Sequence, residues 1–316
     1  MNDIDQSPHA TFIVPVAATT EDGSTVATKL NDMFDGSRSL FVSLTSKTGQ
    51  PNASSAGVVV YSGNGPASMA CGDREIVFPV QKIGDLEVSR RVYVPAEDAF
   101  ARHLEVVKNT GSSPHTLTVG IGNNLGSDLR TKIDATSDGD TEVELSDTWI
   151  ASFQSYSAKT SSDIRMGHVL KAEGQLGASL VVLTFVDGKD QPYWWWSLTL
   201  NPGETQILAS YVAGQPSRAA ARDKATELSG MHNAHMFDCL TPEARAQIVN
   251  FPVQCDTVGS AGAICNDFDR CTLDDVCVAG ACTGTIKDCR SGASDCTGVC
   301  DSASGACVED SVVDGT

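Results

Sequence analysis

Histidines close to carboxylates are the residues of this 316-residue sequence that could carry out acid–base chemistry. His103 and Glu105 stand two residues apart in a strand-like segment, so they would face the same side of a sheet. His168 follows Asp163 and Arg165. Acid–base chemistry on a sugar needs a histidine and a carboxylate, or two carboxylates, that converge in a cleft. Such a cleft would define a sugar-active enzyme with His103 or His168 as its acid–base.

No catalytic motif accompanies these histidines. The sequence contains no GxSxG elbow, HExxH helix, Walker A loop or Rossmann fingerprint. His232 and His235 are three residues apart and would share one face of a helix, but no third metal ligand follows them, which favours a loop or a helix end. The sequence therefore favours a protein without catalytic residues and without a cofactor.

The run Tyr193-Trp-Trp-Trp196 is the most unusual aromatic feature. In a strand, Trp194 and Trp196 face one side and Trp195 faces the other. Exposed aromatic rings stack on sugars, so Tyr193, Trp194 and Trp196 are the candidate platform for a glycan or a protein partner. Large aromatic side chains also fill sandwich cores and subunit interfaces, and core packing is the interpretation that we favour.

Cysteines concentrate at the C-terminal end, where nine of the eleven lie in residues 255–307. Residues 255–316 carry 11 acidic and three basic side chains and a single aromatic one, Phe268, so they cannot bury enough apolar surface to fold without cross-links. The absence of a CxxC pair and of histidine there argues against zinc. The predicted disulfide cysteines are Cys239, Cys255, Cys265, Cys271, Cys277, Cys282, Cys289, Cys296, Cys300 and Cys307.

The odd number of cysteines in the tail leaves the pairing open. If Cys239 pairs with the tail, Cys71 is left as a free or intermolecular thiol, and this is the arrangement that we predict. If Cys71 pairs with Cys239 instead, one tail cysteine is left over. The spacing of the cysteines does not decide between the two.

Aspartates of the same tail are candidate calcium ligands, namely Asp267, Asp269, Asp274 and Asp275. Their spacing does not match an EF-hand, which needs a glutamate at its twelfth position. The formal charge of the whole chain is −18, so neutralising paired carboxylates would be favourable. A structural calcium ion at these four residues is therefore an expectation that chelation can test.

The remaining sequence predicts the elements that would position these residues. Short β-rich segments alternate with turn clusters such as Asn64-Gly and Asn201-Pro-Gly, which predicts an all-β, large two-sheet antiparallel β-sandwich over residues 1–254. Two late helices are expected at about 217–229 and 241–250. A small disulfide-rich C-terminal module, residues 255–316, would follow.

The composition argues against nucleic acid as a partner and against a transmembrane helix. Hydrophobic residues make up 41% of the chain, which is enough for a core, whereas the net charge of −18 repels the phosphates of nucleic acids. No run of 18 apolar residues is present, so no transmembrane helix is expected.

Residues 265–284 resemble one unit of the tandem Cys-rich repeats of bacterial secreted and surface proteins. The repeat pattern is C-x-D-x-x-x-C-T-x-x-D-x-C-x-x-G-x-C-x-G, and the matching residues here are Asp267, Thr272, Asp275, Gly280 and Gly284. Residues 289–307 resemble the spacer between such units. The resemblance implies secretion or surface exposure, and a chain that belongs to a longer repeat protein or is a processed product.

Residues 86–128 are similar to large β-sandwich domains of bacterial surface proteins. The similarity lies in Arg90-Arg-Val-Tyr-Val-Pro, Arg102-His-Leu-Glu-Val and Asn124-Leu-Gly-Ser-Asp. With Asn201-Pro-Gly-Glu-Thr, a strand and an Ala-rich helix after them, the pattern resembles the supersandwich of galactose-mutarotase-like and glycosidase accessory domains. This resemblance implies a fold, and a fold does not define a function.

These patterns lead to three functional hypotheses. The leading one is an extracellular structural or adhesive cell-surface protein, a subunit of a larger assembly or filament, with partners among its own copies, other surface proteins and glycans. The alternatives are a carbohydrate-binding module and a sugar-active enzyme of mutarotase-like shape. The N-terminal residues 1–8 lack the basic and apolar regions of a signal peptide, so we expect the export signal to have been removed before residue 1.

Overall fold

The computed structural model describes most of the chain as two compact units. The described residues are 3–4, 12–13, 33–34, 38–156, 159–160, 164–174, 176–253, 255, 260–269, 271–289, 298–301 and 305–309. The first unit comprises residues 1–239 with 249–251, and the second comprises residues 240–248 with 252–316.

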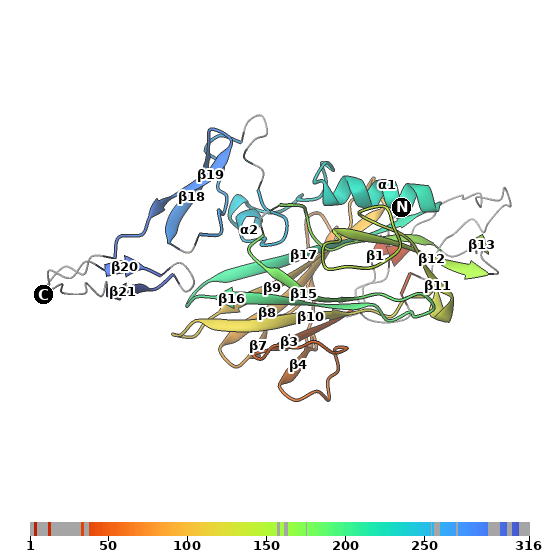
Figure 1. Ribbon diagram of the computed structural model, residues 1–316, viewed down its shortest axis with the longest axis horizontal. Helices are drawn as coiled ribbons and strands as arrows, with labels where there is room; N and C mark the ends of the chain where they lie inside the picture. Colours follow the sequence, from red (N-terminus) through yellow and green to blue (C-terminus); the bar gives the residue numbers. More distant parts are fainter. Residues whose placement is uncertain are drawn as a thin grey trace, which may run out of the picture. The chain divides into compact units, whose positions relative to one another are not determined.

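Two antiparallel sheets form the body of the first unit (Figure 1). The five-stranded sheet has the order β15-β16-β10-β3-β4, and its strands are β3 (Ser39–Ser43), β4 (Val58–Tyr61), β10 (His115–Gly122), β15 (Ser179–Thr184) and β16 (Tyr193–Leu200). The larger sheet has the order β11-β12-β14-β17-β9-β8-β6-β5, with β13 paired to β12 and β7 paired to β8.

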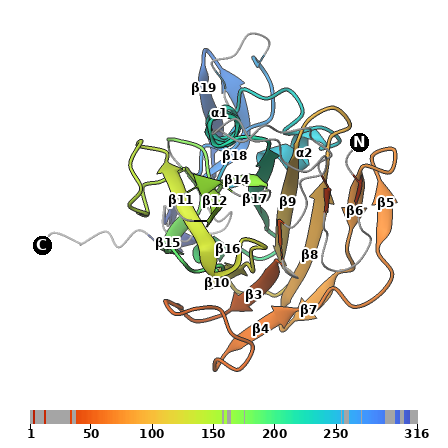
Figure 2. The same cartoon turned by 90° about the vertical axis from the view of Figure 1, so that its right-hand side faces the viewer.

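The larger sheet is built from ten strands, and the order β17, β9, β8, β6, β5 can be followed from left to right in Figure 2. Its strands are β5 (Ser68–Ala70), β6 (Glu75–Val77), β7 (Gln81–Ile83), β8 (Leu86–Tyr93), β9 (Phe100–Asn109), β11 (Thr131–Thr136), β12 (Trp149–Tyr156), β13 (Lys159–Thr160), β14 (Arg165–Val169) and β17 (Thr205–Gln215). A short pair, β1 (Asp3–Ile4) with β2 (Phe12–Ile13), and the 3-10 turn Asp128–Arg130 also belong to this unit. The predicted antiparallel all-β body is therefore confirmed.

The inner face of the five-stranded sheet is apolar. The strand registers set Val119 opposite Trp196 and Val42, and Ile121 opposite Trp194 and Leu40. All six side chains are buried. Burial of aliphatic side chains of this size stabilises a fold by about 1.5–3 kcal/mol each, so this layer is a main source of the body's stability.

The helix α1 (Arg218–Ser229) covers the outer face of the larger sheet. Its N-terminus is capped by Ser217, whose hydroxyl accepts a hydrogen bond from the Ala220 amide at 3.1 Å. Gly167 of β14 lies directly beneath it, because a Cβ atom there would stand 2.9 Å from the Ala221 carbonyl oxygen. The alanines that predicted this helix therefore permit its close approach to the sheet.

The second unit contains the helix α2 (Pro242–Ala246) and two hairpins, β18 (Thr272–Val278) with β19 (Ala281–Ile286) and β20 (Gly298–Cys300) with β21 (Cys307–Glu309). Thr241 caps α2, and the helix ends at Ala246 rather than near residue 250 as expected. The core of the second unit consists of the disulfides Cys255–Cys277 and Cys265–Cys282, and Val253 and Ala263 pack against them.

Four disulfides lie within this second unit, which confirms a disulfide-rich C-terminal region. They are Cys255–Cys277, Cys265–Cys282, Cys271–Cys300 and Cys289–Cys307. Cys296 lies outside the described residues. Within the described part of the chain, neither α1 nor α2 has the length and apolar character needed to cross a bilayer.

Candidate functional site

Six buried polar side chains lie between the two sheets, and we call them the interior charge cluster. They are Arg38, Arg90, His103, Glu105, His168 and Ser210. The registers of the larger sheet set His103 opposite Ser210, Glu105 opposite Arg90, and His168 opposite Val212 of the same strand as Ser210. The five members of the cluster that lie in this sheet therefore share one face. It is the face toward the five-stranded sheet, because Arg38 contacts both Ser210 of the larger sheet and Trp194 of the five-stranded one.

One carboxylate of the cluster, Glu105, is paired directly with the guanidinium group of Arg90. Arg90 donates from Nε to both Glu105 oxygens at 3.1 and 3.0 Å and from Nη2 to Oε1 at 2.7 Å. Its Nη1 donates to the Arg38 carbonyl oxygen. Because bidentate pairs of this kind are strong and directional, Glu105 is held as the counter-ion of Arg90.

Arg38 has no such carboxylate among the described residues. Its Nη2 donates to the Ser210 hydroxyl at 2.5 Å, and its guanidinium carbon lies 5.3 Å from the centre of the Trp194 ring. Nε and Nη1 have no hydrogen-bond partner in the described structure, although the residue is only 5% exposed. Burial lowers the pKa of Arg38 to about 9, while Glu105 raises it and Arg90 lowers it further.

The two histidines of the cluster are neutral at pH 7. Burial, followed by the charge of Arg38, lowers the pKa of His168 to about 3, and the same causes together with Arg90 hold the pKa of His103 well below its usual value. His168 Nε2 is hydrogen-bonded to the Ser152 hydroxyl at 2.9 Å, which orients the ring. His103 is 4% exposed and His168 is 1% exposed, so neither imidazole is accessible to a substrate in this arrangement.

The expected aromatic platform is not exposed, so that hypothesis is wrong for its two tryptophans. Trp194 and Trp196 are 2% and 1% exposed because they face the larger sheet. Tyr193 is partly buried on the opposite face, beside Trp195, Phe41 and Val58. The alternation along the strand is as predicted, but both faces are covered: Trp195 donates its indole N–H to the Gly49 carbonyl oxygen at 2.8 Å.

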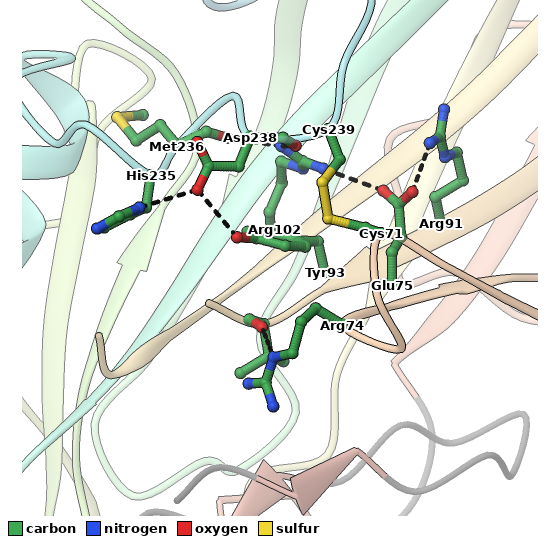
Figure 3. The surroundings of a disulfide bond; sticks show 11 residues. Cys71, Arg74, Glu75, Arg91, Tyr93, Arg102, His235, Met236, Asp238 and Cys239 are labelled. Atoms are coloured by element: carbon green, nitrogen blue, oxygen red, sulfur yellow. Dashed lines mark hydrogen bonds and ion pairs between the residues drawn. A yellow bond between two sulfur atoms is a disulfide. The ribbon is translucent and has the colours of Figure 1, made fainter. Parts of the chain in front are cut away.

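The prediction of a free or intermolecular Cys71 thiol is also wrong, because Cys71 is bonded to Cys239 (Figure 3). Cys71 lies in the turn between β5 and β6, and Cys239 ends the segment that follows α1, yet their Cα atoms are 5.7 Å apart. That segment runs over the outer face of the larger sheet, where Arg102 donates to the carbonyl oxygens of Met236 and Asp238 at 2.9 Å each. Cys239 therefore belongs to the body and not to the tail set.

A network of ion pairs and hydrogen bonds, fully buried at Glu75 and Arg102 and exposed at His235, surrounds this disulfide, and the sequence did not single it out. Glu75 accepts hydrogen bonds from Arg102 and from Arg91, and His235 and Tyr93 both contact the Asp238 carboxylate, at 2.8 and 3.1 Å (Figure 3). Charged residues inside otherwise buried strands, such as Arg102 in β9, were the signal that could have indicated it. The network fixes the segment before Cys239 to the sheet.

The histidine pair after α1 is placed as the sequence favoured. His232 and His235 lie in the loop that follows the helix, and Nδ1 of His235 is hydrogen-bonded to the Asp238 carboxylate. Among the residues that the structure describes, the one group of three potential metal ligands within 4.8 Å of one another is Cys255, Cys265 and Cys277. Their sulfurs are engaged in disulfides.

The candidate calcium ligands lie on the first hairpin of the second unit and on the loop before it. Asp267 and Asp275 are adjacent, since the Asp267 amide donates to Asp275 Oδ2 at 3.0 Å. Asp269 instead accepts from the Cys271 amide at 2.8 Å, and Asp274 is exposed. Calcium binding here stays a prediction, which the melting temperature with and without EDTA would check.

Comparison with known proteins gives weak likenesses alone. No protein-family model and no curated protein matches the chain. Among solved structures, it is similar to a polysaccharide lyase (10% identity over 72% of this chain and 34% of that one, TM-score 0.40). It is also similar to a galactose mutarotase-like protein from Lactobacillus casei, with 12% identity over 68% of this chain and 99% of that one and a TM-score of 0.35. A galactose mutarotase related enzyme from Lactobacillus acidophilus is similar with 9% identity over 68% of this chain and 97% of that one and a TM-score of 0.32.

The chain spans about a third of the length of the lyase. Likenesses at this level do not bear on activity.

Proposed function

We propose that this protein is an extracellular structural or adhesive protein of a cell surface, and that its second unit mediates contact with other chains. The observation that carries the proposal is the set of five disulfides, one in the body and four in the small second unit. Disulfides at this density persist in oxidising compartments and are reduced in the cytosol. They support a location outside the cell.

Burial of the acid–base candidates supports a role without catalysis. His103 and His168 are enclosed between the sheets and neutral at pH 7, so neither is poised to exchange a proton with a substrate. Trp194 and Trp196 do not offer a glycan platform, because both rings are buried.

Apolar side chains on the hairpins of the second unit support a role in assembly. Ile286 is 80% exposed at the end of β19, and Leu273 and Val278 on β18 are about half exposed. Val299 and Val308 on the second hairpin are similarly exposed. Five exposed apolar side chains on the hairpins of so small a unit offer contact points for other chains, and this supports the assembly role.

The compartment is tested by counting thiols in protein purified from its native source without reductant. We expect the five disulfide-linked peptide pairs in a non-reduced digest, and recovery from the cell exterior. Free thiols at these ten cysteines, or a cytosolic location, would contradict the extracellular part of the proposal.

The assembly role is tested by light scattering over a range of concentrations and by binding to whole cells. Ile286→Asp is expected to weaken self-association or cell binding, whereas Thr285→Asp, an exposed neighbour on the same strand, is the matched control. If the unmodified protein stays monomeric and binds no cells, the structural or adhesive role is wrong even where the disulfides are found.

A further inference from the structure

The interior charge cluster carries one positive charge more than its carboxylate neutralises. Arg38 and Arg90 are both enclosed, and Glu105 is the one carboxylate that faces them among the described residues. Glu105 is already bidentate with Arg90. His103 and His168 face the same space as neutral rings and supply no charge.

Unused hydrogen-bonding atoms surround this excess charge. Nε and Nη1 of Arg38, Nδ1 of His103 and Nδ1 of His168 are buried and have no partner in the described structure. Buried polar atoms in folded proteins are almost always hydrogen-bonded, so four unpartnered atoms in one cluster need an explanation.

The strand registers place His103 and His168 on the two strands that flank Ser210, the residue that binds Arg38. Ser210 binds Arg38, and its direct neighbour across the sheet is His103. His168 lies on the other side of β17, opposite Val212, which is two residues after Ser210. Arg38 is therefore flanked by one histidine from β9 and one from β14.

The Trp194 ring does not replace a counter-ion. A guanidinium group over an aromatic face gains an electrostatic attraction, but this offsets only part of the cost of taking a cation out of water. The hydroxyl of Ser210 provides one hydrogen bond and no charge. An anion would supply both the missing charge and the missing acceptors.

We propose that Arg38 holds a small monovalent anion inside the sandwich, a halide or a short carboxylate such as acetate. Both carry one negative charge and accept several hydrogen bonds, as the free Nε and Nη1 atoms require. A doubly charged anion is disfavoured, because its desolvation is larger and only one positive charge is uncompensated. This inference is independent of the extracellular role and is tested by a separate experiment.

Thermal unfolding in different sodium salts at one ionic strength tests the site. Chloride, bromide and acetate are compared with gluconate, whose size excludes it from a closed interior. A ligand bound to the native state raises the melting temperature with the logarithm of its concentration, so we expect a rise of about 3 °C per tenfold increase above the dissociation constant. The salt that produces the rise distinguishes a halide from a carboxylate.

Two variants separate a specific site from general salt effects. Arg38→Met should remove the difference between the small anion and gluconate, while Lys82→Met, which removes an exposed cation, should retain it. An identical salt response in the unmodified protein and in Arg38→Met would overturn the proposal.

Crystals grown in sodium bromide, or in sodium acetate where acetate is the stabilising anion, provide a readout that needs no variant. We expect bromide anomalous density, or acetate density, beside Nε or Nη1 of Arg38 in the unmodified protein. If Arg38→Met does not fold, this density decides the question. Density confined to the molecular surface, or an interior carboxylate of the chain itself on Arg38, would refute the anion site.

Discussion

Arg102 and Glu75 form an ion pair from which solvent is completely excluded. Nη2 of Arg102 lies 3.0 Å from Oε1 of Glu75, and neither side chain has any exposed surface. The same guanidinium group lies 4.6 Å from the Tyr93 ring centre and binds the segment before Cys239 through Nη1. A single buried cation thus connects β6, β9 and the segment that follows α1 (Figure 3).

Glu75→Gln should strongly destabilise the first unit. The substitution leaves Arg102 buried without a counter-ion, and loss of one partner of a buried pair costs about 3–5 kcal/mol. Urea unfolding followed by tryptophan fluorescence measures this, since all four tryptophans lie in the first unit. The control is Glu87→Gln, which disrupts the exposed contact with Lys82 and should cost less than about 1 kcal/mol. Equal losses in both variants would contradict the importance of the buried pair.

Removal of the body disulfide should destabilise the same unit by a different mechanism. Cys71 and Cys239 are 168 residues apart, so the bond restricts a long segment of the unfolded chain. Replacing both by serine should lower the free energy of unfolding by about 2–5 kcal/mol. The fluorescence-detected urea midpoint is the measurement. Adding reductant should bring the unmodified protein toward the variant, and a midpoint that does not respond to either change would argue against the cross-link.

Local sequence patterns predicted the strands well because alternation is a property of a few neighbouring residues. The run 193–200 forms β16, with Trp194 and Trp196 on one face as its pattern requires. What the pattern could not predict is which faces are covered. Trp195 is buried on the outer face because the loop that contains Gly49 packs over it, and nothing in residues 193–200 encodes that loop.

Long-range pairings were beyond the sequence for the same reason. Cys71 is joined to a residue 168 positions away, and cysteine spacing in the tail does not reveal that Cys239 is already paired. His103 and Glu105 were correctly expected to share a face, but Arg38 precedes a strand and gave no sign of being buried. The interior charge cluster becomes visible only when four strands of one sheet, β8, β9, β17 and β14, are in register with Arg38 against them.

Gly120→Ala tests the packing over the outer face of the five-stranded sheet. A Cβ atom at Gly120 would lie 2.6 Å from carbons of the Trp195 ring, so the indole must shift. Overpacking of this kind costs about 1–3 kcal/mol, measurable as a lower urea midpoint. Gly49→Ala is the matched control, because a Cβ there meets nothing within 4 Å, and we expect a change within about 0.5 kcal/mol. A neutral Gly120→Ala would mean that Trp195 is not held against β10.

The neutral state of His168 predicts that acid destabilises the protein before its carboxylates are protonated. The pKa of His168 is about 3 in the folded chain against about 6.5 unfolded, so below pH 6.5 the unfolded state binds a proton that the folded state does not. Stability contributed by the neutral ring is therefore present above pH 6.5 and is lost as the pH falls from 6.5 toward 3.

The expected loss from His168 alone is about 1.6 kcal/mol between pH 6.5 and 5, because the slope rises from half of about 1.4 kcal/mol per pH unit at pH 6.5 to nearly the full value at pH 5. Urea unfolding of His168→Gln should show a correspondingly smaller fall in stability over this range, because glutamine keeps a polar contact for Ser152 but binds no proton. His103, whose pKa is also well below its usual value, accounts for a further part of the slope in both proteins.

Proton NMR of the His168 ring provides the direct check. In the folded protein its Hε1 signal should not titrate down to about pH 4, whereas in the urea-unfolded chain it should titrate near pH 6.5. A folded-state midpoint near 6.5 would show that water reaches the imidazole, and the interior charge cluster would then be open to solvent rather than enclosed between the sheets.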